Sequence, residues 1–233
     1  MDCKIIRIPT HRVNVYLIIS GSKAILVDPG VGKHLPVVYA SIREHGLALN
    51  DIKMLILTHT HYDHVDGIKE VREKTGARIL VQSNEAESLR RGYTELPRGT
   101  ILPGRILSFL GRKLVPSIGS YPPAVADILI EERYDITELD VPAFVIHTPG
   151  HTRGSVSVII DNEYAFVGDC MFGIFRRSIL PPFADDPAAL MRSWQVLADT
   201  GCSTFYPGHG KSIDRQRFED NLRKFILTIP HGA

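Results

Sequence analysis

The sequence contains little cysteine and no long apolar run. Only three of its 233 residues are cysteine, and none lies in a Cys-x-x-Cys pair, so neither a disulfide framework nor a zinc ribbon is indicated. No stretch approaches the roughly 20 apolar residues of a membrane span. The start, Met-Asp-Cys-Lys, is not the charged region of a signal peptide. We therefore expect a cytoplasmic protein that does not use a membrane.

The sequence also lacks an excess of charge of either sign. It has 27 Lys and Arg against 26 Asp and Glu, which gives a formal net charge of +1. A nucleic-acid-binding domain usually carries a basic excess, so no nucleic-acid partner is expected. With 44% apolar residues the chain is ample for a sizeable hydrophobic core. We expect residues 1–233 to form a single domain.

Short apolar runs alternate with amphipathic stretches along most of the chain. Runs rich in Ile and Val predict strands over 3–8, 13–20, 23–28, 54–58, 78–82, 127–131, 139–147, 155–160, 163–168 and 204–206. Apolar residues at helical spacing, or helix start signals, predict helices over 35–46, 67–75 and 83–91, after Asp186, and around Phe218.

Residues 83–126 depart from this pattern because proline and glycine interrupt them repeatedly. The apolar residues between these breaks are Ile106, Leu107, Phe109, Leu110, Leu114 and Val115. We interpret the segment as a cap-like insertion with one short amphipathic helix. It could be a substrate lid or the contact of a homodimer, or it could simply pack on the core. The sequence leaves these alternatives open.

The most informative segment is Thr58-His59-Thr60-His61-Tyr62-Asp63-His64. It places three imidazoles and one carboxylate on a tight loop directly after a predicted strand. Such donors suit Zn²⁺ best, with Fe or Mn as alternatives. A polar surface turn that merely contains three histidines is the competing interpretation. The pattern favours a metal site because further donors occur in matching positions.

These further donors are His151, Asp169 and His209. Each comes just after a predicted strand, and a glycine directly precedes each one. A rigid sheet can aim such side chains into one cleft, and the glycine allows a tight turn there. Seven donors exceed what one tetrahedral zinc requires. We therefore predict two metal ions that share Asp169.

Four motifs together resemble the metallo-β-lactamase superfamily, and the resemblance covers essentially the whole chain from Asp28 onward. They are HTHYDH at 59–64, HTPGHT at 147–152, Gly-Asp at 168–169 and PGHG at 207–210. The resemblance implies a four-layer αββα sandwich. It also implies that His59, His61 and His151 hold one metal, that Asp63, His64 and His209 hold the second, and that Asp169 bridges them.

The resemblance further implies an enzyme. The run 147–152 looks most like the branch that contains glyoxalase II and lactonases, whereas true β-lactamases of this fold more often alter the ligand set. We expect a dinuclear metal-dependent hydrolase, in which a metal-bound hydroxide attacks an ester, thioester or lactone bond of a small acyl substrate. Asp63 and Asp169 are the expected catalytic carboxylates, with Asp63 orienting the nucleophile or accepting its proton. Asp28 either holds the second nitrogen of a histidine ligand or caps a turn.

The loop after Asp169 bears on the substrate. In glyoxalase II and the persulfide dioxygenases this loop carries a Gly-Cys-Gly-basic pattern, which is not found here, so glutathione recognition is not indicated. Phe172 and Phe175 predict an apolar pocket wall. Arg176 and Arg177 either clamp an anionic substrate or form a solvated basic pair.

Two alternative activities remain open at this level. A mononuclear iron persulfide dioxygenase resembles the same ligand set but uses only His59, His151 and Asp169. A phosphodiesterase or nuclease of the same fold is the other alternative, and the near-neutral charge weighs against it.

Overall fold

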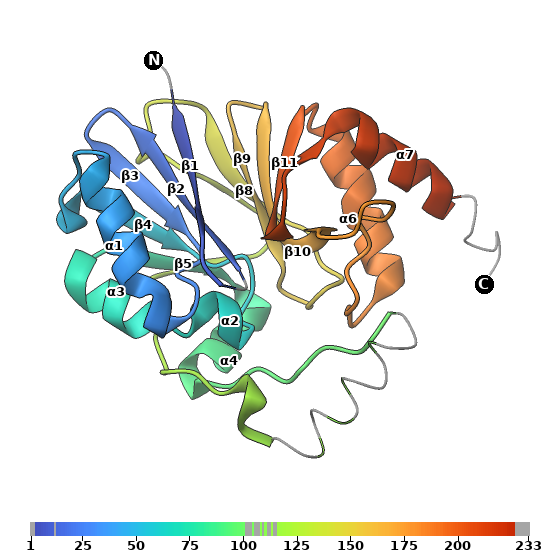
Figure 1. Cartoon of the computed structure of the whole chain (residues 1–233), viewed down its shortest axis with the longest axis horizontal. Helices are drawn as coiled ribbons and strands as arrows, with labels where there is room; N and C mark the ends of the chain where they lie inside the picture. Colours follow the sequence, from blue (N-terminus) through green and yellow to red (C-terminus); the bar gives the residue numbers. More distant parts are fainter. Residues whose placement is uncertain are drawn as a thin grey trace.

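The computed structural model describes residues 3–11, 13–100 and 116–226, together with residues 104, 108, 110 and 113. Most of the helix predicted within the insertion, including Ile106, Leu107, Phe109, Leu114 and Val115, lies outside the described residues. The strands are β1 (Lys4–Pro9), β2 (Asn14–Ser20), β3 (Lys23–Val27), β4 (Ile52–Ile56), β5 (Arg78–Gln82), β6 (Ile128–Ile130), β7 (Arg133–Asp135), β8 (Ala143–His147), β9 (Val156–Ile160), β10 (Tyr164–Gly173), β11 (Thr204–Gly210) and β12 (Ile213–Asp214). The helices are α1 (Leu35–Glu44), α2 (Tyr62–Val65), α3 (Ile68–Thr75), α4 (Ser83–Arg91), α6 (Pro187–Asp199) and α7 (Arg215–Ile226), with short 3-10 turns at Gly32–His34, Leu49–Asp51 and Pro116–Gly119 (Figure 1).

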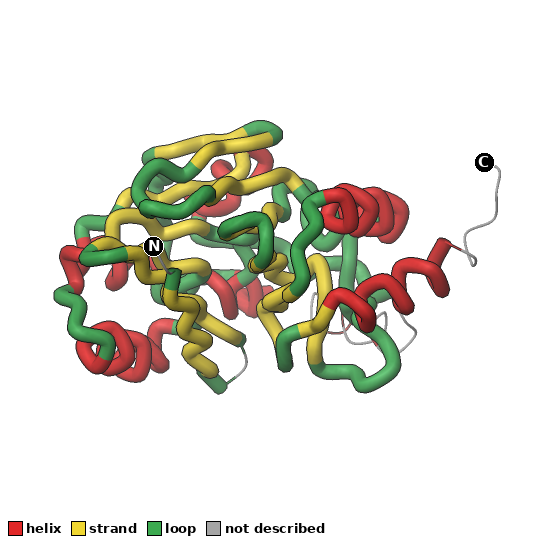
Figure 2. Tube along the Cα trace, turned by 90° about the horizontal axis from the view of Figure 1, so that it is seen from above, coloured by secondary structure: helices red, strands yellow, loops and turns green. Residues whose placement is uncertain are grey.

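The strands form two six-stranded sheets. The first has the order β1-β2-β3-β4-β5-β6, and the second has the order β12-β11-β10-β9-β8-β7. β3, β4, β5 and β6 run parallel, so the ends of these strands meet along one edge. In the second sheet β10 and β11 are the parallel pair. Viewed from above, the strands occupy the middle of the molecule and the helices lie toward its outside (Figure 2).

Alternation along β2 explains how the sheets are packed. Val15 and Leu17 face a core shared with α1 and α3, while Tyr16 and Ile18 face a second core shared with the other sheet. Because successive side chains of a strand point to opposite faces, a strand buried on both sides must lie between two layers. A third core, which includes Trp194 of α6, fills the space between the second sheet and its helices. The expected four-layer αββα sandwich is therefore confirmed.

Two strands are longer than the sequence predicts. We expected Asp169 and His209 to follow their strands, but this is wrong: β10 continues to Gly173 and β11 to Gly210, so both residues lie within strands. The pairing of β10 with β11 resumes at Phe172 opposite His209 after register shifts on both sides of Gly168. The strand is therefore irregular around Gly168, which adopts φ +49°, but it continues to Gly173.

Besides the 3-10 turns, one short α-helix and two short strands were not predicted at all, namely α2, β7 and β12. Each has two to four residues, which is too short for a periodic pattern to reveal. Among the residues with described structure, no helix has the length and apolar character that a membrane crossing requires.

Candidate metal centre

Seven side chains from both sheets converge at one edge of the sandwich. His59 and His61 lie in the loop between β4 and α2, and Asp63 and His64 lie on α2. His151 lies in the loop between β8 and β9, while Asp169 and His209 come from β10 and β11. Backbone contacts tie the sheets together here, since the Val156 amide donates to the Thr58 carbonyl at 2.8 Å. The ligand-type residues are thus held by the rigid part of the fold.

Asp169 occupies the middle of this cluster. Its Oδ1 lies 3.4 Å from His64 Nε2, and its Oδ2 lies 3.5 Å from His151 Nε2 and 3.4 Å from His209 Nε2. His209 Nε2 also lies 3.4 Å from Asp63 Oδ2. On the other side, His151 Nε2 lies 2.9 Å from His61 Nδ1. One carboxylate therefore contacts donors from both halves of the cluster.

The donors fall into three overlapping groups whose ligand atoms lie within 4.8 Å of one another. The groups are His59, His61 and His151; His59, His64 and Asp169; and Asp63, His64 and His209. All of these residues except Asp63 are buried. The structure therefore brings together every one of the seven residues that the sequence nominated as metal ligands.

Several buried atoms in the cluster make no hydrogen bond within the described part of the chain: His59 Nε2, His61 Nε2 and Asp169 Oδ1. Unpaired buried polar atoms are rare and need an explanation. Imidazole nitrogens and carboxylate oxygens are ordinary ligands of divalent metals. The residues present therefore fit the divalent metal ions that the resemblance implies.

Glycine at position 208 makes the close approach of these donors feasible. A Cβ atom added to Gly208 would lie 2.5 Å from His64 Cε1 and 2.6 Å from Asp169 Oδ1. A similar constraint applies at Gly168, where an added Cβ would lie 2.5 Å from Thr58 Oγ1. The glycines that precede two of the ligands are thus required by space at the cluster itself.

Electrostatics distinguish two pairs of histidines in the cluster. Burial, reinforced by the neighbouring histidines, lowers the pKa of His61 to about 3 and the pKa of His59 well below its usual value. These imidazoles are neutral at physiological pH and keep a free lone pair. Although burial opposes it, the negative charge of Asp169 raises the pKa of His209 to about 10 and the pKa of His64 well above its usual value.

The two carboxylates are ionised. Burial alone would raise their pKa values, but the nearby histidines outweigh it. The hydrogen bond with His209 lowers the pKa of Asp63 to about 2, and the charges of His209 and His64 hold the pKa of Asp169 well below its usual range. Six of the seven donors thus comprise two anionic carboxylates, two neutral imidazoles and two imidazoles whose protons a cation would displace.

Asp28 lies behind the ligands. Its Oδ2 lies 2.8 Å from His64 Nδ1 and accepts a 2.7 Å hydrogen bond from Thr58 Oγ1, while its Oδ1 accepts the Thr58 amide at 2.8 Å. Thr58 Oγ1 in turn lies 3.0 Å from His59 Nδ1. Such outer contacts fix the orientation of the ring that presents its other nitrogen to a metal. His151 is held similarly, with Nδ1 2.9 Å from the Phe183 carbonyl.

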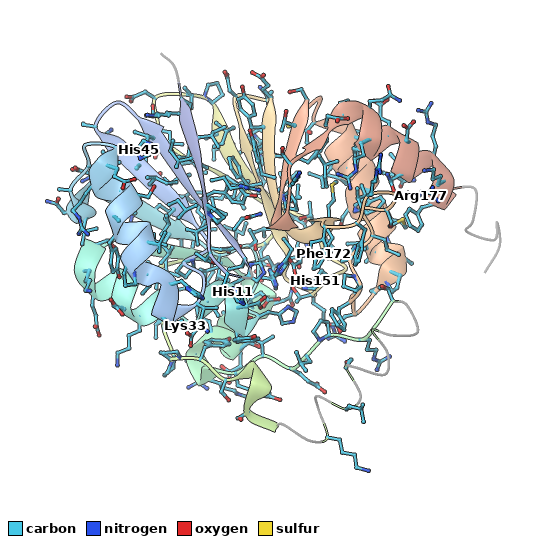
Figure 3. The ribbon with its side chains drawn as sticks, in the orientation of Figure 1. His11, Lys33, His45, His151, Phe172 and Arg177 are labelled. Atoms are coloured by element: carbon cyan, nitrogen blue, oxygen red, sulfur yellow. The ribbon has the colours of Figure 1, made fainter. Side chains whose placement is uncertain are left out.

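A pocket of about 340 Å³ opens onto this cluster. Its lining residues are His61, Tyr62, Asp63, Thr94, Leu96, Pro97, Ser108, Gly119, His151, Asp169, Phe172, Phe183 and His209. Phe172 contacts the donor cluster, with its ring centroid 4.8 Å from that of His209, and Figure 3 labels it close to His151, which lines the same pocket. Thr94, Leu96 and Pro97 show that the 83–126 segment forms part of the pocket wall.

Three other residues nominated from the sequence lie elsewhere. Phe175 is 39% exposed and is not among the residues that line this pocket. Arg176 and Arg177 are exposed and line a separate surface depression with Arg217 of α7, and Figure 3 shows Arg177 beside α7, away from His151. The described geometry therefore corresponds to a solvated basic pair, not to a clamp in the metal pocket.

One buried residue near the ligands escaped the sequence analysis. Glu85 of α4 is 4% exposed and accepts hydrogen bonds from Thr60 and Gly154. Its helix reads Ser-Asn-Glu-Ala-Glu-Ser-Leu-Arg-Arg, in which Glu85 and Glu87 look alike. Only the helical spacing of the apolar residues Ala86 and Leu89 could have indicated which glutamate faces inward.

Known proteins resemble this chain over nearly its full length. Residues 8–209 match the model of the metallo-beta-lactamase superfamily. A probable metallo-hydrolase of Methanocaldococcus jannaschii is 31% identical over 214 residues, which cover 89% of this chain and 92% of that protein. An atrochrysone carboxyl ACP thioesterase of Aspergillus chevalieri is 26% identical over 204 residues, which cover 86% of this chain and 52% of that protein.

A solved structure gives the same result for the fold. The metallo-beta-lactamase of Cronobacter sakazakii with a HARLDQ motif superposes with a TM-score of 0.73 and covers 96% of this chain and 88% of that chain. Its sequence identity to this chain is 18%. At that identity the likeness concerns the fold, and the activity must be argued from the site.

Proposed function

The chain belongs to the metallo-beta-lactamase superfamily, and from that premise we propose that it is a hydrolase that uses two divalent metal ions to cleave an ester, thioester or lactone bond of a small acyl substrate. That it is a metal-dependent hydrolase follows from its fold and from its metallo-hydrolase and thioesterase relatives. The number of metals, their identity and the bond that is cleaved are the proposal.

The position of Asp169 is the observation that carries the two-metal proposal. Its carboxylate oxygens lie 3.4–3.5 Å from His64, His151 and His209, so it can serve both halves of the cluster at once. His59, His61 and His151 would hold one metal, and Asp63, His64 and His209 would hold the other. Zinc is the metal we propose, because tetrahedral imidazole and carboxylate sites suit it.

When bound, divalent metals would polarise the substrate carbonyl and lower the pKa of water toward about 7. The chain supplies a base beside them: Asp63 lines the pocket, is ionised, and lies 3.4 Å from His209 Nε2. We propose that its carboxylate orients the attacking water and accepts its proton. Asp28 and Thr58 hold the His64 and His59 rings, respectively, in a fixed orientation during this transfer.

The pocket favours an apolar acyl group. Leu96, Pro97, Phe172 and Phe183 form much of its wall, and such side chains hold an acyl chain by burial of apolar surface. Among the described residues, the only acidic or basic side chains that line it are those of Asp63, Asp169 and three histidines of the cluster, His61, His151 and His209. The thioesterase named above supports a thioester as the first substrate to try.

The proposal is tested by metal analysis combined with a substrate screen. We expect zinc-loaded protein to hydrolyse acyl thioesters, aryl esters or lactones in preference to phosphodiesters and β-lactams, and the apoprotein to hydrolyse none of them. Preferred hydrolysis of a phosphodiester would contradict the proposed bond class. Oxygen consumption with a persulfide and bound iron would contradict the hydrolase itself.

A further inference from the structure

Glu85 is a buried carboxylate that is neither a proposed metal ligand nor a proposed catalytic residue. It is 4% exposed on α4, whereas Glu87 on the same helix is exposed and paired with Arg90 and Arg91. Within the described part of the chain, no Lys, Arg or His side chain forms an ion pair with Glu85. A buried charge without a charged partner is unfavourable unless hydrogen bonds compensate it, so its contacts are informative.

Among the described residues, the groups that donate hydrogen bonds to Glu85 all belong to two loops that carry metal ligands. Oε2 accepts the Thr60 amide at 3.1 Å and also the Thr60 hydroxyl, and Oε1 accepts the Gly154 amide at 3.1 Å. Thr60 stands between His59 and His61, and Gly154 follows His151 by three residues. One carboxylate thus joins a loop of the first sheet to a loop of the second at the point where three ligands meet.

The sequence is adapted to this contact. A Cβ atom on Gly154 would lie 2.5 Å from Glu85 Cγ and 2.9 Å from Gln82 Oε1. No φ in the left-handed region is involved at this position, so the requirement for glycine is one of space. Gly154 lets the backbone approach Glu85 closely enough for its amide to donate.

The contact also extends to the substrate pocket. Thr60 Oγ1 lies 2.8 Å from Thr94 Oγ1, which lies 2.8 Å from the Tyr121 hydroxyl. Thr94 lines the pocket, and Thr94 and Tyr121 both come from the 83–126 segment. A chain of hydrogen bonds therefore connects Glu85, the HTHYDH loop and the pocket wall.

We propose that Glu85 is a positioning residue of the metal centre: it fixes the His59–His61 loop against the His151 loop. The proposal rests on the metal-binding function proposed above. Loss of the carboxylate would release two backbone amides and one hydroxyl. The ligand rings would then lose the fixed spacing that a metal requires, and metal affinity would fall. Outer contacts of this kind typically contribute about 10–100-fold to metal affinity or activity.

The test measures Zn²⁺ affinity of the full chain by competition with a chromophoric chelator. We expect Glu85→Gln to bind Zn²⁺ about 10–100-fold more weakly than the wild type, because the amide keeps one acceptor oxygen but places an NH2 donor against a group that is itself a donor. Glu85→Asp keeps the carboxyl group on a shorter side chain and should recover part of the affinity. Glu87→Gln is the matched control on the same helix, and we expect it to bind like the wild type.

Thermal unfolding of the apoproteins distinguishes a role in positioning the ligands from a role in fold stability alone. A lower unfolding temperature of Glu85→Gln with unchanged Zn²⁺ affinity of the folded protein would overturn the proposal. If Glu85→Gln does not fold, Gly154→Ala is tested instead, because its added methyl group displaces the Glu85 carboxylate without removing it. Unchanged Zn²⁺ affinity of Gly154→Ala would also overturn the proposal. Failure of the wild type to bind Zn²⁺ would instead contradict the proposed function.

Discussion

The Oδ2 atom of Asp28 lies 2.8 Å from Nδ1 of His64. The same carboxylate accepts two hydrogen bonds from Thr58, and Asp28 adopts φ +53°, a conformation that Asp and Asn tolerate better than most residues. This arrangement leaves Nε2 of His64 directed at Asp169 and His209. The pair therefore determines which nitrogen of His64 is offered to a metal.

Asp28→Asn should weaken metal binding without unfolding the protein. Asparagine accepts the positive φ, but its amide would donate to Nδ1 of His64 and so place the ring proton on Nε2, where it blocks coordination. We expect Zn²⁺ affinity to fall about 10–100-fold, measured by chelator competition. Asp220→Asn is the control, because Asp220 is an exposed partner of Arg223 on α7. Wild-type affinity in Asp28→Asn would contradict this role.

Metal binding should release protons. Although burial opposes it, the negative charge of Asp169 raises the pKa of His209 to about 10 and the pKa of His64 well above its usual value. Without metal both rings are protonated at neutral pH, and coordination requires them to be neutral. Apparent affinity should therefore increase as pH rises from neutral toward about 10. Calorimetric titration in buffers of different ionisation enthalpy measures the release, and a binding heat that is independent of the buffer would refute it.

The metal ligands were predictable from the sequence because their signals are local. HTHYDH places four donors within six residues. Each of the three distant ligands follows a glycine, and a Cβ atom added to any of these glycines would lie too close to a neighbouring residue. The four-layer arrangement of helices and sheets was predicted from the family resemblance. The irregular ends of β10 and β11 were not predictable, since the shifts around Gly168 depend on how the two strands pair.

Residues whose role depends on packing could not be identified this way. Phe172 and Phe175 are three positions apart in the sequence that follows Asp169, yet Phe172 lines the pocket and Phe175 does not. Glu85 and Glu87 are similar in the sequence of α4, and only the face that the helix turns toward Thr60 distinguishes them. Long-range contacts decide these cases, and a single sequence does not record them.

Phe183→Ala should reduce the preference for long acyl chains. Phe183 lines the pocket, and its main-chain carbonyl lies 2.9 Å from His151 Nδ1, so removal of the phenyl ring leaves the ligand contact in place. We expect kcat/KM for a hexanoyl ester to fall about tenfold relative to an acetyl ester. Phe175→Ala and Arg177→Ala lie outside the pocket and should leave this ratio unchanged. An unchanged ratio in Phe183→Ala would exclude this side chain from the acyl site.

Asp169→Ala should abolish hydrolysis and preserve the fold. The two histidines that Asp169 keeps protonated, His64 and His209, can become neutral when it is removed, so no uncompensated charge is left behind. We expect a loss of activity larger than the roughly 10–100-fold typical of outer contacts, with an unchanged far-UV circular dichroism spectrum. Substantial activity in this variant would show that the metal assignment is wrong.

The number of metal ions per chain tests the central claim most directly. The seven donors form overlapping groups that share His59 and His64, with Asp169 in contact with His64, His151 and His209. We predict that the purified protein, saturated with Zn²⁺ and freed of excess, contains about two ions per chain by elemental analysis. Asp169→Ala should contain fewer. A stoichiometry that stays at one in the wild type, with every ligand intact, would contradict the two-metal account.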